Sequence, residues 1–170
     1  MKFVFILFLS LCITSCSINQ SIGQEKKYNK LTALEKQIVN PDLTINKKKA
    51  KKLFQKALKF NKKHPANKHK ESIYVLAAKC SDGLNWNTKN IEIIDLLLVE
   101  FPQSKNSSNY LYNKGKIYEE KIKDIEKSKT IYRQIIKQYP NTELAKNLVD
   151  YLKFISKSDQ EQLEFLKHKN

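Results

Sequence analysis

The chain has few of the residues that interrupt helices, with 3 glycines and 4 prolines among its 170 residues. Its glycines, Gly23, Gly83 and Gly115, lie too far apart for a P-loop or a GxGxxG dinucleotide-binding motif. Long runs that alternate between apolar and polar residues are also missing, which argues against strands. With 41% hydrophobic and 29% charged residues, the composition is that of a folded helical chain with one sizeable core.

Arginine is almost absent. Arg133 is the one arginine among 32 basic residues, although the formal net charge is +15. Surfaces that read nucleic acid usually carry more arginine, because the forked guanidinium matches phosphates and base edges. We therefore expect no nucleic-acid partner. The excess of Lys, Asn and Ile fits the codon usage of an AT-rich genome.

Metal-binding and reactive residues are scarce as well. His64 and His69 lie on either side of a proline, and no HExxH motif or Cys/His cluster is present, so no metal or other cofactor is expected. No serine stands in a glycine-flanked elbow. Glu119 and Glu120 are expected on an exposed helix face, where they aid solubility. The sequence thus predicts no catalytic site and a protein that is not an enzyme.

The chain starts with one lysine and an apolar segment that ends near Ile13. This segment is too short for a permanent membrane span and has the length of a secretory signal. It closes with Ile-Thr-Ser-Cys at 13–16, which resembles the lipobox of bacterial lipoproteins. The resemblance implies a signal peptide over 1–15, cleavage before Cys16 and lipidation of Cys16. The alternative is an ordinary signal peptide cut after Ser15 or Ser17.

Cysteine usage agrees with a lipobox. Cys12 would leave with the signal peptide and Cys16 would be acylated, so Cys80 has no disulfide partner. Cys80 shares a helix face with apolar residues, which predicts a buried small side chain rather than a nucleophile.

The region after Cys16 is expected to be a flexible tether over 16–30, because it mixes small and polar residues with little periodicity. A short helix over Leu31–Val39, capped by Thr32, and a longer one over about 46–63 then form a degenerate repeat over 31–65. The outer face of the longer helix is lined by Lys47–Lys49, Lys51, Lys52 and Lys56. Such a charged face is usually a solvated surface.

Two helix–turn–helix units come next, and they are related by a fixed offset. Pro102 in the first corresponds to Pro140 in the second (140 − 102 = 38), and the same shift places Ala77 on Gly115. A period of this size predicts stacked two-helix repeats, each unable to bury its apolar face alone.

The second unit resembles the tetratricopeptide repeat. Its first helix has Gly115 three residues before Tyr118, and its second has Ser128 and then Tyr132 before the closing proline. The interval from Tyr118 to Ser128 is one residue longer than in the standard repeat.

We therefore expect an all-α fold, a short right-handed α-solenoid of tetratricopeptide-like repeats over 31–170. Its parts are the degenerate repeat, two repeats at about 70–102 and 107–140, and a capping helix pair at 141–170. The dense apolar run over 90–101 predicts a helix that is buried on both sides.

The lipobox and the repeats together resemble the outer-membrane-associated periplasmic tetratricopeptide proteins, such as the lipoprotein of the β-barrel assembly machinery and the Tol–Pal-associated coordinator. The resemblance implies a lipid-anchored, non-catalytic scaffold in the bacterial cell envelope, at the outer membrane and facing the periplasm. Its partner would be an envelope protein or peptide held by the first helices of the repeats. The candidate partner-binding residues are Tyr74, Lys79, Asn113, Lys114 and Lys121. The alternative is a basic surface module that binds anionic lipid or cell-wall polymer through Lys47–Lys56.

Overall fold

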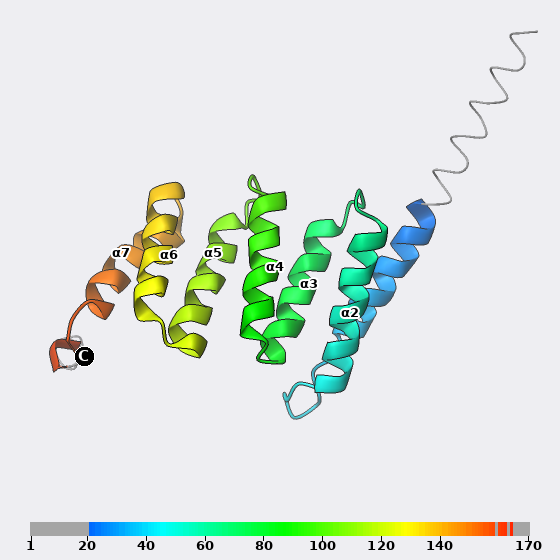
Figure 1. The fold of residues 1–170 in the computed structure, drawn as a ribbon, viewed down its shortest axis with the longest axis horizontal. Coiled ribbons are helices and arrows are strands. Elements are labelled where there is room, and N and C mark those ends of the chain that lie inside the picture. Colours follow the sequence, from blue (N-terminus) through cyan, green and yellow to red (C-terminus); the bar gives the residue numbers. More distant parts are fainter. Residues whose placement is uncertain (1–20, 159, 163, 165–170) are drawn as a thin grey trace, which may run out of the picture. The chain divides into compact units, whose positions relative to one another are not determined.

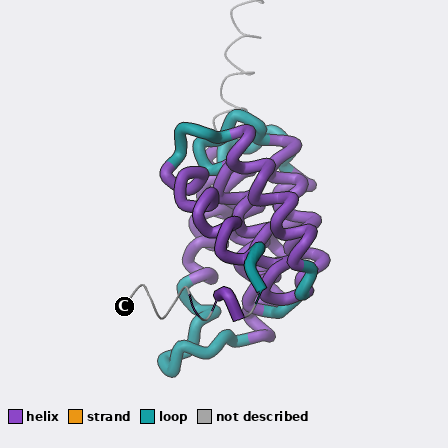
Figure 2. The backbone as a smooth tube through the Cα atoms, turned by 90° about the vertical axis from the view of Figure 1, so that its left-hand side faces the viewer, coloured by secondary structure: helices purple, strands orange, loops and turns teal. Residues whose placement is uncertain are grey.

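The computed structural model describes residues 21–158, 160–162 and 164, which form helices joined by short loops (Figures 1 and 2). The chain divides into two compact units, one ending at Trp86 and the other beginning at Asn87. The first unit contains a helix over 21–35, α2 (Lys47–Lys63) and α3 (Lys70–Gly83). The second contains α4 (Asn87–Glu100), α5 (Ser107–Lys116), the π-helix η1 (Ile117–Ile122), α6 (Ile125–Gln138) and α7 (Glu143–Ile155).

The predicted all-α class is confirmed. Among the described residues the extended structure is limited to one isolated β-bridge, between Val39 and Ile45. Helices that follow one another pack together within each unit, α2 on α3 in the first, and α5 on α6 and α6 on α7 in the second. These are the helix–turn–helix pairs of which α-solenoids are built.

The tether predicted over 16–30 is wrong for residues 21–30, because residues 21–35 form one helix. This helix is fixed by polar and aromatic contacts that an apolar pattern does not reveal. The Tyr28 ring stacks on His69 with centroids 3.7 Å apart, and Glu25 Oε2 lies 2.9 Å from His69 Nε2. Thr32 is therefore inside the helix rather than at its cap, and its hydroxyl donates to the Asn29 carbonyl oxygen. Cys16 and the rest of 1–20 lie outside the described residues.

The helix α2 begins and ends where the sequence predicts. Asn46 caps it by accepting a hydrogen bond from the Lys49 N–H at 3.0 Å. Its buried side, which includes Leu53 and Ala57, faces α3, and the Trp86 ring at the end of the unit meets Phe54 edge-on at 5.5 Å. Cys80 is fully buried on α3, as predicted, and burial raises the pKa of its thiol to about 11.

The helix α4 is not buried on both sides, contrary to the prediction. Ile93, Ile94 and Leu97 are buried, but Val99 is 77% exposed and Leu96 is 41% exposed. The apolar run is thus longer than the face that α4 buries. Apolar density alone does not distinguish a helix with two buried sides from one with an exposed apolar edge.

The first helix of the tetratricopeptide-like unit contains the additional residue that the sequence shows between Tyr118 and Ser128. It begins as α5 and widens into the π-helix η1, which ends at Lys123 in a left-handed conformation with φ 67°. A π-helix accommodates one extra residue without ending the helix. At the packing side of α5, Gly115 leaves room for Tyr132, since a Cβ there would lie 2.4 Å from Tyr132 Cε1.

The predicted C-terminal cap is described in part. The helix α7 covers its first half, with Thr142 accepting from the Ala145 N–H at 3.2 Å. Ser158 and Glu161 form a capping box, in which the Ser158 N–H donates to Glu161 Oε2 at 2.8 Å and the Glu161 N–H donates to Ser158 Oγ at 3.4 Å.

Candidate functional site

The π-helix places one carboxylate inward, at the centre of a group of hydroxyls from two other helices. Glu119 Oε2 accepts hydrogen bonds from Tyr132 Oη at 2.7 Å and from Ser128 Oγ at 3.4 Å, both on α6. Glu119 Oε1 accepts from the Tyr151 hydroxyl on α7. The Tyr132 ring also contacts the rings of Tyr112 at 5.8 Å and Tyr151 at 5.9 Å. We call Glu119, Ser128, Tyr132 and Tyr151 the Glu119 cluster.

The electrostatics of this cluster follow from burial. Tyr132 is fully buried, and desolvation first, then the Glu119 carboxylate, raise the pKa of its phenol far above the ordinary value, against the opposing hydrogen bond from Ser128. The pKa of Tyr151 is raised for the same two reasons, burial first and Glu119 second. Both phenols therefore stay protonated and act as donors.

The expectation that Glu119 and Glu120 are both exposed is right for Glu120 alone. Glu120 is exposed and pairs with Lys116 at 2.8 Å, whereas Glu119 is half-buried within its cluster. A turn of π-helix holds more residues than a turn of α-helix. The side chain of residue 119 therefore points to a different side of the helix than it would in a regular α-helix. The extra residue between Tyr118 and Ser128 was the one sequence signal for this change.

The structure separates the five candidate partner-binding residues. Tyr74 is buried in the core of the described structure and only 9% exposed, which argues against the predicted contact between Tyr74 and a partner. Lys114 is half-buried and paired with Asp95 on α4, and Lys79 is paired with Glu35 at 2.9 Å. Asn113 and Lys121 are exposed. Neighbouring positions on a helix point in different directions, which is why Asn113 and Lys114 differ.

An open stripe runs along α5 into η1. It consists of Asn109, Asn113, Lys116 and Glu120, which recur every three or four residues, together with Tyr112, which lies three residues after Asn109 and four before Lys116 on the edge of the same face. Asn109, Asn113 and Glu120 are exposed, and Tyr112 and Lys116 are half-buried. We call these five residues the α5 stripe. Its amides, phenol and ion pair can donate and accept hydrogen bonds, as the backbone of an extended peptide requires.

Neither the Glu119 cluster nor the α5 stripe has the make-up of a metal site. Across the described residues, no three His, Cys, Asp or Glu side chains come together in a way that could hold a metal ion. The Glu119 carboxylate is engaged by hydroxyl donors of its own unit, so the cluster fixes helices to one another. In the same part of the chain, no helix combines the length and the apolar character that crossing a bilayer requires.

Comparison with known proteins agrees with this geometry. Residues 110–142 match the family model of the tetratricopeptide repeat, and the match spans most of α5, all of η1 and α6, and the turn after α6. None of the curated proteins matches the chain. The chain thus contains one segment with the features of a tetratricopeptide repeat within an all-helical fold, and repeats of this kind generally mediate contacts between proteins.

Proposed function

We propose that the protein is a non-catalytic scaffold of the bacterial cell envelope that binds a protein or peptide partner along the α5 stripe. Two facts support the proposal. The stripe lies on the first helix of the repeat that matches the tetratricopeptide family, and its exposed side chains are hydrogen-bonding groups rather than charges of one sign. An extended peptide offers backbone donors and acceptors that asparagine amides satisfy in pairs.

The observation that carries the proposal is the rigidity of the helix below the stripe. Its inner side is fixed at two levels, by the packing of Gly115 on Tyr132 and by the Glu119 cluster one turn later. A surface whose supporting side chains are locked loses little conformational entropy when a partner binds. The stripe is therefore preorganised for binding.

The anchoring part of the proposal rests on the sequence. Lipid attached to Cys16 would hold the protein at a membrane, and the outer membrane with the domain facing the periplasm is the proposed location. Stable attachment requires two acyl chains or one chain with a second membrane contact. Cys16→Ala should abolish incorporation of labelled fatty acid. A substituted protein that still incorporates it would contradict the lipobox.

Site-specific cross-linking tests the binding face. A photoreactive amino acid at Asn113 should capture a partner in intact cells, whereas the same group at Gln134, exposed on α6, should not. The charge variants Asn109→Glu and Asn113→Glu together should weaken capture, while the matched pair Gln134→Glu and Asn147→Glu should leave it unchanged. Lys114 is unsuitable for this test because its substitution breaks the pair with Asp95. Equal capture from Asn113 and Gln134 would refute the assignment of the face.

A further inference from the structure

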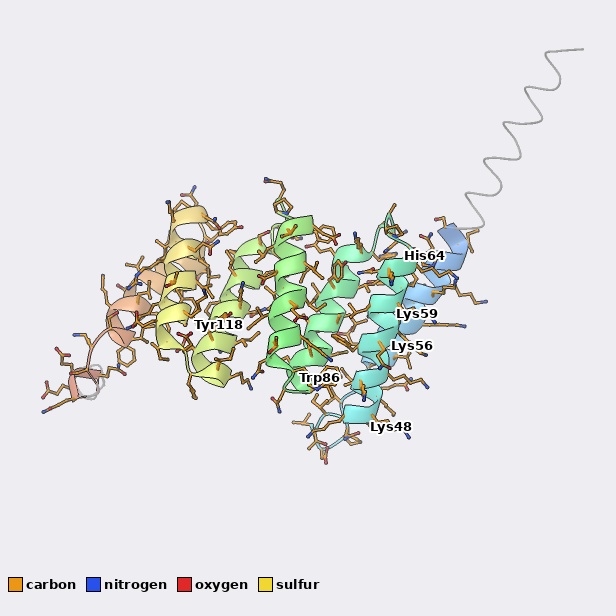
Figure 3. The ribbon with its side chains drawn as sticks, viewed as in Figure 1. Lys48, Lys56, Lys59, His64, Trp86 and Tyr118 are labelled. Carbon is orange, nitrogen blue, oxygen red and sulfur yellow. The ribbon has the colours of Figure 1, made fainter. Side chains whose placement is uncertain are left out.

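The exposed face of α2 is built almost entirely from lysine. Its exposed residues are Lys47, Lys48, Lys49, Lys51, Lys52, Gln55, Lys56, Lys59, Lys62 and Lys63. The helix contains no acidic residue, and none of these lysines forms an ion pair with another described residue. Figure 3 shows Lys48, Lys56 and Lys59 following one another along the helix. We call these nine lysines the α2 face.

The charge of the protein is concentrated in the unit that contains this face. Residues 1–86 hold 17 lysines and 5 acidic residues (17 − 5 = +12), and residues 87–170 hold 15 basic and 12 acidic residues (15 − 12 = +3). Genome-wide codon bias would raise lysine in both units alike. It would not remove acidic residues from one of them, so the bias explains the abundance of lysine but not its placement.

Three of the five acidic groups of the first unit are engaged by residues outside the α2 face. Glu25 is paired with Lys68 at 2.8 Å and with His69, and Glu35 is paired with Lys79. The Asp42 carboxylate accepts hydrogen bonds from the N–H and the hydroxyl of Thr44. The positive charge also affects His64, which caps the C-terminal end of α2. The pKa of His64 is lowered by burial first, and then by the charges of Lys27 and Lys63.

An apolar tip stands directly before the first turn of α2. Leu43 is 83% exposed, and Val39 on the other side of the same loop is 47% exposed. Leu43 has φ 65°, a left-handed conformation that is strained for leucine. Hydrogen bonds impose it, since the Leu43 N–H donates to the Asn40 carbonyl oxygen at 3.0 Å and the Asn40 N–H donates to the Thr44 carbonyl oxygen at 2.8 Å. The loop therefore holds a leucine in solvent at an energetic cost.

We propose that the α2 face and the Leu43 tip form a docking surface for a bilayer that contains anionic phospholipid. Lysines are compact point charges that suit a diffuse layer of headgroups, and a leucine beside them can enter the acyl boundary. Nucleic acid is the weaker candidate, because the face has no arginine and no aromatic side chain on which a base could stack. The surface lies in the first unit, so it stands independently of partner binding along the α5 stripe.

Vesicle binding tests this surface. The full chain with Cys16→Ala, which removes the proposed lipidation, is titrated with vesicles of phosphatidylcholine alone and of phosphatidylcholine mixed with phosphatidylglycerol. The contribution of residues 1–20 is common to every variant, so the ratio of the two partition coefficients isolates charge-dependent binding. We expect a large ratio at low salt that falls steeply as salt is added.

Matched charge variants locate the binding. Replacing Lys48, Lys52, Lys56 and Lys59 with Gln should lower partitioning into the anionic vesicles by roughly six hundredfold, since each lysine near a surface contributes roughly fivefold and the four factors multiply. Replacing four exposed lysines of the second unit, Lys105, Lys121, Lys137 and Lys146, with Gln makes the same change in net charge. This control should cost less than about threefold. Equal losses from both quadruple variants would overturn the proposal, because net charge would then suffice.

The apolar tip has its own pair of variants. Leu43→Asn should remain folded, because asparagine tolerates the left-handed conformation, and it should lower binding to anionic vesicles by about tenfold. Val99→Asn changes an equally exposed apolar residue of the second unit and should have no effect. Unchanged binding of Leu43→Asn would overturn insertion of the tip. A wild-type chain that binds a duplex oligonucleotide or a soluble polyphosphate through these lysines, but leaves the anionic vesicles unbound, would overturn the membrane as the partner.

Discussion

Tyr132 occupies the space that a side chain on residue 115 would need. A Cβ on Gly115 would lie 2.4 Å from Tyr132 Cε1 and 3.0 Å from Tyr132 Cδ1, and the Tyr132 ring is fully buried. The ring cannot turn away, because its hydroxyl donates to Glu119 and the rings of Tyr112 and Tyr151 lie beside it. The small residue and the aromatic residue of this repeat are thus one packing unit.

Gly115→Ala should therefore destabilise the protein by about 1–3 kcal/mol, because overpacking outweighs the helix propensity that alanine gains. Gly23 supplies the control, since it is also helical and, apart from its chain neighbours and the backbone of its own helix, no atom lies within 4 Å of the position that a Cβ would take there. Gly23→Ala should leave stability unchanged or raise it by up to about 1 kcal/mol. Urea denaturation followed by circular dichroism measures both. A stabilised Gly115→Ala variant would contradict the packing described.

The Glu119 cluster predicts a strong asymmetry between two adjacent glutamates. Glu119→Gln removes the charge that three hydroxyls stabilise and should cost about 1–3 kcal/mol. Glu120→Gln breaks an exposed ion pair with Lys116 and should cost less than about 0.5 kcal/mol. Denaturation curves of the two variants decide the matter, and equal effects would mean that Glu119 is as exposed as its neighbour.

Much of the fold could be predicted from the sequence. The fixed offset between Pro102 and Pro140 predicts the repeat, and apolar spacing predicts α2 at about 46–63. The features that escaped prediction depend on contacts between residues distant in the sequence. The helix over 21–35 is fixed by Tyr28 and Glu25 against His69, which lies more than forty residues later (69 − 25 = 44).

The candidate site was harder to predict than the fold. Of the candidate residues, Asn113 is exposed, but Tyr74 is buried and Lys114 is paired with Asp95. Helical spacing gives the relative directions of side chains without stating which direction faces solvent. Glu119 was missed because a π-turn rotates the residues after it, and a single extra residue does not say where in a helix it is absorbed.

Alkaline titration should reveal the two tyrosines of the Glu119 cluster. Their pKa values are raised in the folded state, above the ordinary value of 10.0. The unfolded chain loses these protons first, so the stability they contribute is complete below about pH 10 and is lost as pH rises beyond it. Absorbance at the tyrosinate band should show Tyr132 and Tyr151 ionising only as the helical signal disappears. Ionisation of all tyrosines with the helices intact would contradict the cluster.

The buried face of α4 and the exposed face of α2 should differ sharply in their tolerance to truncation. Leu97 is 1% exposed, so Leu97→Ala should cost about 2–5 kcal/mol in the free energy of unfolding. Lys51 lies on the α2 face, and Lys51→Ala should change this energy by less than about 0.5 kcal/mol. Chemical denaturation measures both, and comparable losses would contradict the assignment of faces.

Acidification should weaken the first unit in two steps. The pKa of His64 is lowered from 6.5, by burial first and by Lys27 and Lys63 after it, so the unfolded chain takes up a proton more readily than the folded one. Stability is therefore present above about pH 6.5 and falls as pH drops below it. The pKa of Glu25 is lowered from 4.5, first by its hydrogen bond with His69 and then by that with Lys68, so its contribution is lost as pH falls below about 4.5.

Denaturation midpoints measured across this range should show both steps, and His64→Gln should remove the upper one while leaving the lower one in place. A His64→Gln protein that keeps the upper step would show that another group titrates there.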